Sequence, residues 1–537
     1  MEKRVLIAVV LSIALVVMWG YFMPHPAQNN VKRSLKNSKK SIIANSSKAI
    51  NLNKSDNINI KSNINTVNSI KNKKNSNANI PQKKLVFSNK LLKAGFYIPA
   101  GSIYSLSLKK YYYSPSNINN KVNLENASKI NQIINFKLSS RFSSITFIGK
   151  KINKNRDALK FIYKINNKIL LIKEYKFSKN SNSNNDKRYL IKLIIFAKNI
   201  SKQPVLFSGD LNLSAGLNPN IKGKINYLNY SSIIYINNKT ITPVLNSTKP
   251  LKYTGNISFA GFNSKYFLFS VINPGNVAIY NKHNNIITYK FHKKLLIAPG
   301  QSKQFMYNIY AGPKKLSLLN PAGHDISSTL SFGFFSFLSI PLLHILEFFY
   351  AFVHNYGLAI ILLVLCIRIV FYPLTYTGFK SMKQMQKLTP KINELREKYK
   401  DNKADLNKRI MELYKESKVN PLGGCLPMIL QIPVFYGLYT TLGTSIQLRN
   451  APLILWIHNL AAPDPYYILP ILMGLSMLIS QKMNPMVGDP TQAKIMLVLP
   501  IVFTFIFINF PAGLLLYWTV NNILTIAQQY IINKKFA

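Results

Sequence analysis

Acidic residues are scarce in this chain of 537 residues, which carries 17 Asp and Glu against 69 Lys and Arg. The formal net charge of +52 first suggests a nucleic-acid partner. However, the lysines are scattered among Asn, Ile and Ser, and neither a nucleic-acid-binding motif nor an Arg-rich helix accompanies them. We interpret most of the charge as compositional bias and solvated surface, and we expect no sequence-specific nucleic-acid partner.

Cysteine is almost absent too. The two thiols, Cys366 and Cys425, lie in or beside apolar segments. Two isolated cysteines provide neither a disulfide framework nor a metal site. The phosphate-binding pattern G-x-x-x-x-G-K-[ST] is also missing. We therefore expect no metal, no cofactor and no redox chemistry.

Long apolar runs are present, and the first lies at the N-terminus. Lys3 and Arg4 precede about 18 apolar residues that end at Phe22. A cleavable signal peptide would have a shorter apolar region and a small-residue cleavage site soon after it, whereas Pro24 and Pro26 follow here. We predict an uncleaved transmembrane anchor over residues 1–24, with its N-terminus in the cytoplasm.

The composition changes twice after the anchor. Residues 25–84 are rich in Asn, Lys, Ser and Ile without a sustained period, which predicts a disordered linker. Residues 85–326 contain β-branched and aromatic runs such as SSITFIGK and YLIKLIIFA, separated by turns, which predicts a β-sandwich outside the cytoplasm. Residues 327–355 are aromatic-rich and broken by Pro341, which predicts an amphipathic helix in the membrane interface.

The last part of the chain, residues 356–537, contains five further apolar segments, at about 357–377, 422–442, 466–480, 495–510 and 512–527. With the anchor they make six crossings, so both termini are expected in the cytoplasm. The loop at residues 380–418 carries twelve Lys or Arg, which places it inside as well. The last three segments span only about 24 Å, less than a hydrocarbon core of about 30 Å. The sequence thus predicts a multi-domain membrane protein with six transmembrane helices and an extracytoplasmic all-β domain.

The charged loop at residues 380–418 has helical periodicity on both sides of a turn at KDNKAD, which predicts an antiparallel helical hairpin. Pro390 either starts a new helix or kinks a longer one. The hairpin either merely joins two crossings or docks a partner; its length favours docking, because short connections suffice to join helices. The residues expected on the docking face are Met382, Met385, Leu388, Leu395 and Met411.

A single arginine, Arg368, stands inside the apolar run from Leu358 to Phe371, with no acidic residue within ten positions on either side. An arginine at the centre of a spanning helix costs about 2.5–3.5 kcal/mol on insertion scales. Its charge should therefore have a function.

Three stretches carry a resemblance to a known family. They are VNPLGGCLPMILQIPVFYGLY, LWIHNLAAPDPYYILPILMGLSMLISQKM and FPAGLLLYWTVNNILTIAQQ. With their surroundings they resemble the membrane core of the YidC/Oxa/Alb insertase family nearly continuously from Phe332 to Ile532. AGSIYSLSLKKY, FAGFNSKYF and YAGPK resemble, with more divergence, the large periplasmic domain of its Gram-negative members, which usually have Trp where Phe259 stands here.

The resemblance implies an insertase rather than an enzyme. Its clients would be nascent membrane proteins, which it would help into the inner membrane alone or together with the Sec translocon. Membrane lipid would be a further partner. It also implies a polar groove that is open to the cytoplasm and to lipid, with the family's arginine at Arg368. Groove water would hydrate the charge, which could then attract the polar tail of a client. Many relatives carry a longer basic tail where only Lys534 and Lys535 stand here, which leaves ribosome contact in doubt.

Polar or amphipathic residues within the crossings are the other candidates for the groove: Gln431, Gln481, Tyr517 and Trp518. Each has a second interpretation. A glutamine in a membrane often only joins helices, and Tyr or Trp often only anchors a helix at the interface.

Two other functions fit parts of the sequence. An anion channel or transporter would use Arg368 for selectivity, but no inverted repeat accompanies it. A periplasmic carbohydrate enzyme would need paired carboxylates. Residues 85–313 offer only carboxylates that are widely spaced in sequence, namely Glu125, Asp157, Glu174, Asp186 and Asp210.

Overall fold

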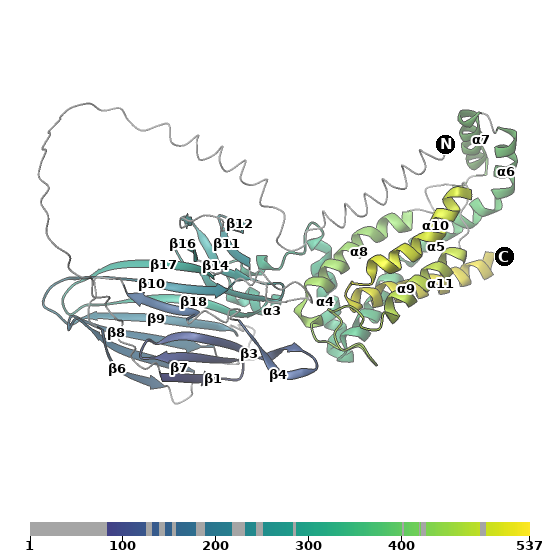
Figure 1. Ribbon diagram of the computed structural model, residues 1–537. Helices are drawn as coiled ribbons and strands as arrows, with labels where there is room; N and C mark the ends of the chain where they lie inside the picture. The colour runs from purple at the N-terminus through teal and green to yellow at the C-terminus, as the bar shows by residue number, and fades with distance from the viewer. Residues whose placement is uncertain are drawn as a thin grey trace, which may run out of the picture. The chain divides into compact units, whose positions relative to one another are not determined.

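The computed structural model describes residues 83–536 except 125–131, 139–144, 153–156, 179–187, 217–230, 243–250, 283–285, 400–401, 418, 420–425 and 484–489. The predicted anchor and nearly all of the predicted linker lie outside the described residues. The described chain forms two compact units, a β unit that ends at Ala311 and a mainly helical unit that contains Leu108–Val122 and the chain from Gly312 onwards (Figure 1).

The strands form a sandwich of two nine-stranded sheets. The first has the order β1-β2-β3-β5-β10-β17-β16-β13, with β4 paired to β3, and the second has the order β12-β11-β14-β15-β18-β9-β8-β7-β6. The predicted β-sandwich is therefore confirmed. The strand bounds are β1 Lys83–Ser88, β2 Leu92–Ile98, β3 Ser102–Ser114, β4 Asn117–Asn123, β5 Ile134–Leu138, β6 Ile145–Ile152, β7 Ala158–Ile165, β8 Ile169–Phe177, β9 Leu190–Asn199, β10 Val205–Gly216, β11 Ser231–Ile236, β12 Lys239–Ile241, β13 Leu251–Tyr253, β14 Ile257–Asn263, β15 Phe267–Ile272, β16 Val277–Lys282, β17 Ile286–Ile297 and β18 Ser302–Pro313.

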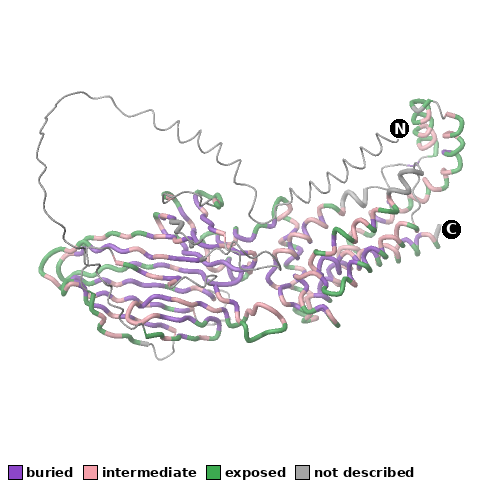
Figure 2. Tube along the Cα trace, in the orientation of Figure 1, coloured by how far each residue is buried: buried purple, intermediate pink, exposed green. Residues whose placement is uncertain are grey.

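Strand alternation builds the core between the sheets, as the alternating colours of the strands in Figure 2 show. Along β8, every second residue is buried, and one of these inward residues is Lys173. Its Nζ donates to Ala100 O and Phe136 O, both at 3.0 Å, and lies 5.1 Å from the centre of the Tyr163 ring. The ammonium group therefore links strand β8 to backbone carbonyls of the opposite sheet. Burial lowers the pKa of Lys173 from 10.5 to about 8.

The helical unit contains eight longer helices within its described residues. Their bounds are α4 Ser336–Val353, α5 Tyr356–Lys387, α6 Thr389–Lys398, α7 Lys403–Glu416, α8 Leu426–Thr444, α9 Ile468–Met483, α10 Pro490–Phe507 and α11 Ala512–Phe536, preceded by the short helix α3 Leu316–Leu319. Judged by length and composition alone, only α4 and α5 among the described residues are long and apolar enough to cross a membrane. The count of six crossings stays a prediction, and α4, which we expected in the interface, also has the length and apolarity of a spanning helix.

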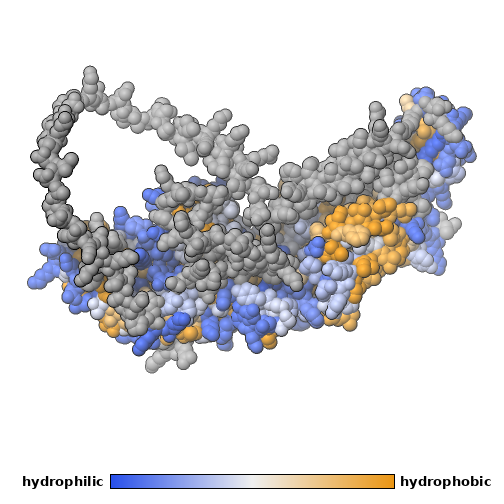
Figure 3. Space-filling model, viewed as in Figure 1, coloured by the Kyte–Doolittle hydropathy of each residue, from blue (hydrophilic) through white to orange (hydrophobic). Residues whose placement is uncertain are grey.

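The outward faces of α9 and α10 are apolar. Large exposed apolar side chains recur on α9 and α10, namely Ile471, Leu475, Ile479, Val498, Ile501 and Phe505. They contribute to the apolar surface of this unit, part of which is the orange area in Figure 3. Contiguous apolar surface of this kind marks contact with lipid or with another protein.

Helix α5 corrects the predicted boundary of the hairpin. It runs for 32 residues from Tyr356 to Lys387, about 48 Å at 1.5 Å per residue, so Met382 and Met385 lie on the end of α5 and not on the hairpin. The apolar period simply continues from the membrane segment into the charged segment. The hairpin consists of α6 and α7, and Pro390 starts α6, because proline lacks the N–H that the first turn leaves unpaired anyway.

Candidate functional site

Arg368 is bound by side chains and backbone of α11. Its Nε donates to Asn521 Oδ1 at 2.9 Å, and its Nη2 donates to Asn521 O at 2.9 Å and to Thr525 Oγ1. All three acceptors are uncharged, and Arg368 takes part in none of the ion pairs found among the described residues. The guanidinium is thus hydrogen-bonded while its positive charge is left unneutralised.

Two predicted groove residues join this cluster. Gln431 on α8 donates from Nε2 to Tyr517 Oη at 3.0 Å and, more weakly, to Asn521 Oδ1 at 3.4 Å. Tyr517 is buried, whereas Gln431 and Arg368 are half-buried. The cluster therefore connects three helices, α5, α8 and α11, through one chain of hydrogen bonds.

The other two predicted groove residues do not join it. Trp518 packs edge-on against Phe435 and Phe507, with ring centroids 4.8 Å apart in both cases. Gln481 is half-buried on α9, and no hydrogen bond connects it to the cluster. Trp518 thus packs against aromatic side chains, and its place in the groove stays a prediction.

Sequence reasoning missed Asn521 and Thr525. A signal was available, because Tyr517, Asn521 and Thr525 follow one another at four-residue steps and so share one face of a helix. Polar residues repeated on one face of an otherwise apolar helix indicate a buried polar contact.

Further polar contacts join α5 and α11 on the C-terminal side of Arg368. Gln528 Nε2 donates to Thr375 Oγ1 at 2.8 Å, and Lys383 Nζ donates to Asn533 Oδ1 at 3.3 Å. Residue numbers rise together on both helices, so α5 and α11 run parallel. We define Arg368, Thr375 and Lys383 with their partners on α11 as the α5–α11 seam.

The hairpin residues differ in exposure. Leu388 and Leu395 are half-buried, and Met411 is 50% exposed. Ile392, which lies between the two leucines, is buried. Met411 is therefore available at the surface of the hairpin.

The loop after α8 is held by a buried aspartate. Asp464 accepts hydrogen bonds from Trp456 Nε1 at 3.0 Å, from Tyr466 N at 3.1 Å and from Leu469 N at 2.7 Å. Leu469 lies in the first turn of α9, where backbone N–H groups have no partner within the helix, and Tyr466 lies two residues before the helix begins. Asp464 therefore fixes where α9 begins.

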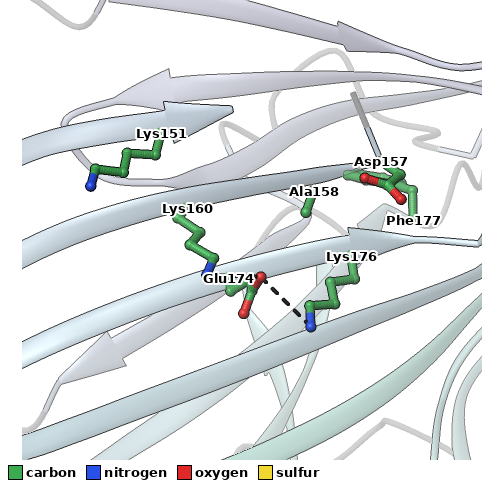
Figure 4. Close-up of a pocket in the computed structure, with 7 residues that line it drawn as sticks. All are labelled: Lys151, Asp157, Ala158, Lys160, Glu174, Lys176 and Phe177. Carbon is green, nitrogen blue, oxygen red and sulfur yellow. Dashed lines mark ion pairs between the residues drawn. The ribbon is translucent and has the colours of Figure 1, made fainter. Parts of the chain in front are cut away.

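The β unit carries two adjoining hollows of about 530 and 490 Å³ on the outer face of β6 to β9 and β18. Both are lined by Lys160, Glu174 and Lys176, and Glu174 Oε1 lies 3.3 Å from Lys160 Nζ and 3.7 Å from Lys176 Nζ (Figure 4). Asp157 also lines the first hollow, but the neighbours of Glu174 are lysines and not a second carboxylate.

Among the described residues of the β unit, the remaining carboxylate does not add a glycosidase-like pair. Asp210 on β10 is hydrogen-bonded to His292 Nδ1. Glu125 and Asp186 lie outside the described residues. The arrangement around Glu174 gives no support to a carbohydrate enzyme, which needs two carboxylates facing one bond.

Comparison with known proteins connects both units to one family. The family model "60Kd inner membrane protein" matches residues 348–537, and the model "YidC periplasmic domain" matches residues 84–345. The membrane protein insertase YidC of Geotalea daltonii is 37% identical over 99% of both chains, and that of Syntrophus aciditrophicus is 40% identical over 84% of this chain and 85% of its own. The crystal structure of an active YidC insertase covers 83% of this chain and 92% of its own, with a TM-score of 0.38 and 17% identity. Two family models that together cover nearly all of the described chain, and a full-length relative at this identity, show that the chain belongs to the YidC membrane protein insertase family.

Proposed function

We propose that this protein inserts nascent membrane proteins into the inner membrane. The observation that carries the proposal is the charge of Arg368, which lies inside an apolar helix and is hydrogen-bonded only by neutral groups. An ion-paired arginine would be electrically satisfied, whereas this one keeps its attraction for a negative or polar group. Curated relatives named as membrane protein insertases support the same function.

The magnitude of the attraction favours a partly buried site. Opposite unit charges 4 Å apart attract by about 1 kcal/mol in water, but by about 4 kcal/mol at an effective dielectric constant of about 20. A polar client tail beside the half-buried Arg368 would therefore gain more than at the membrane surface. The net driving force is the burial of the client's apolar segment in lipid, and no bond needs to be broken.

The topology that we propose has the β unit in the periplasm, both termini in the cytoplasm, and six crossings. In this topology α5 and α11 both run from the periplasmic to the cytoplasmic side. The α5–α11 seam then leads from the arginine towards the cytoplasm, and the polar groups along it would hydrate the groove. Gln431 and Tyr517 would line the groove beside Arg368, and Gln481 is a weaker candidate.

The hairpin of α6 and α7 is the element that we propose to dock cytoplasmic partners. Its exposed Met411 and its high charge suit a reversible contact, and the Sec translocon and the ribosome are the candidate partners. Deletion of residues 389–416, tested by complementation of a depleted strain, should abolish insertion. Viable cells with that deletion would refute the docking role, while deletion of residues 85–303 should leave substantial activity.

The test of the arginine uses reconstituted full-length protein and a single-crossing client, with protease protection of the translocated tail as the readout. Arg368→Lys should retain insertion, because a positive charge remains. Arg368→Ala should fail most for clients with acidic tails and less for clients with neutral tails. If Arg368→Ala inserts acidic tails as well as the parent does, charge attraction is not the mechanism.

An anion channel is the second candidate, because an intramembrane arginine can select anions. Anion flux through the same proteoliposomes discriminates the two functions. Flux that requires Arg368, without client insertion, would favour the channel.

A further inference from the structure

Arg368 has five N–H donors, and α11 accepts from only one side of the group. The Nε and one N–H of Nη2 form the planar edge that normally grips a carboxylate, and here both donate to Asn521. The second N–H of Nη2 goes to Thr525 Oγ1. Within the described chain no residue accepts a hydrogen bond from Nη1, so two donors remain on this one nitrogen.

The acceptors on α11 are themselves fixed. Thr525 Oγ1 donates its proton to Asn521 O at 2.7 Å, which leaves its lone pairs to accept from Arg368. Asn521 Oδ1 also accepts a hydrogen bond from Gln431 Nε2 at 3.4 Å. A long arginine side chain in a membrane helix tends to extend towards the nearest water, and these contacts oppose that movement.

We infer that Asn521 and Thr525 are positioning residues that hold Arg368 with its carboxylate-matching edge closed and Nη1 presented to the client. This inference rests on the proposed function of Arg368 and names what the site recognises. Asn521 occupies the edge formed by Nε and Nη2, and Thr525 occupies the N–H of Nη2 on the other edge, which Nη2 shares with Nη1. Because both edges are closed by neutral acceptors, the charge persists but a bidentate pair with a client carboxylate is excluded. Nη1 can instead hold one carbonyl or one carboxylate oxygen at a time.

Single-atom contacts suit a transit site. A bidentate ion pair in a partly buried site is strong and geometrically specific, so it would retain an acidic tail. A single nitrogen binds the polar atoms of many different tails, including backbone carbonyls, and releases each one readily. The substrate class of the site is therefore a polar polypeptide segment without a fixed motif.

Thr525 offers the cleanest test, because replacing its side chain removes none of the atoms that form the two hydrogen bonds between Arg368 and Asn521. Thr525→Val removes the hydroxyl at almost constant volume, and Thr525→Ser retains it. Thr519→Val is the matched control, since the buried Thr519 lies on the same helix and donates to Leu515 O at 2.8 Å in the same way, and no hydrogen bond joins it to Arg368. Insertion of an acidic-tailed client into proteoliposomes should fall severalfold for Thr525→Val and stay at the parental level for the other two.

A double-mutant cycle separates positioning from a structural role. If Thr525 acts through the arginine, Thr525→Val adds no loss in an Arg368→Ala background. An equal further loss in that background would overturn the inference. So would parental insertion by Thr525→Val when Arg368→Ala fails, whereas parental insertion by Arg368→Ala itself would refute the proposed function instead. If Thr525→Val does not assemble, Thr525→Ala gives the same comparison.

Discussion

Glu347 Oε1 accepts a hydrogen bond from Gln447 Nε2 at 2.6 Å, which joins α4 to the 3₁₀ turn Ile446–Leu448 that follows α8. Lys315 Nζ lies 3.3 Å from the same oxygen. One carboxylate therefore holds two segments of the helical unit against α4.

We expect Glu347→Ala and Gln447→Ala each to lower the thermal unfolding midpoint of the full chain in detergent. Each change removes one partner of a hydrogen bond to a charged group, worth about 1.5–3 kcal/mol before solvent screening of the half-exposed carboxylate reduces it. The double variant should lose less than the sum, because both changes remove the same bond. Fully additive losses would contradict the contact.

Gly357 at the start of α5 has no room for a side chain. A Cβ there would lie 2.0 Å from Leu453 Cδ1 and 2.9 Å from Leu453 Cβ. Gly357→Ala should therefore destabilise the helical unit by about 1–3 kcal/mol, the usual cost of overpacking. The double variant Gly357→Ala, Leu453→Ala should recover part of that loss in the same melting assay. Gly443→Ala is the control, because nothing lies within 4 Å of its Cβ position.

Asp464 should be among the most sensitive carboxylates of the helical unit. Its three N–H donors lose their acceptor together in Asp464→Ala, and we expect a loss of about 3 kcal/mol or failure to assemble. Asp464→Asn retains one carbonyl oxygen and should be intermediate. Glu397→Ala, which removes an exposed carboxylate from α6, should have no measurable effect on the melting midpoint. Equal stability of Asp464→Ala and the parent would show that this carboxylate does not fix α9.

Lys173 should make the stability of the β unit depend on pH. The native state releases the Lys173 proton near pH 8 and the unfolded state near pH 10.5, so the unfolded state binds more protons between these values. Stability therefore rises with pH across that window, by at most about 3 kcal/mol, and this contribution is constant below pH 8.

The measurement is the thermal loss of β-sheet circular dichroism of the full chain in detergent, at several pH values across the window. The variant Lys173→Met should show a smaller rise than the parent, whereas Lys164→Met, which changes an exposed lysine on β7, should follow the parent. Identical slopes for Lys173→Met and the parent would show that the buried ammonium is not the cause.

Local sequence patterns predict the helices and strands of this protein well, but they predict the contacts between those elements less well. The β-sandwich follows from β-branched and aromatic runs that alternate along each strand, as in β8. The end of α5 could not be placed, because its apolar period passes without a break from Phe371 to Met385.

The arginine site was predictable in part. Arg368, Gln431 and Tyr517 stand out as polar residues in apolar segments, and they do lie together. Asn521 and Thr525 are 153 and 157 positions away from Arg368 along the chain, and only the parallel packing of α5 on α11 brings them to it. The sequence of neither helix alone indicates that α5 and α11 pack together.

The order of the strands determines which strands lie at the open edges of the two sheets. An open sheet edge can capture an unfolded chain by pairing with it, and an insertase works beside unfolded chains. The strands at the two ends of each sheet resist such pairing: β12 and β13 have only three residues each, β1 begins with Lys83 and Lys84, and β6 is interrupted between Phe147 and Gly149. The sandwich can therefore stay next to a client without being drawn into a shared sheet with it.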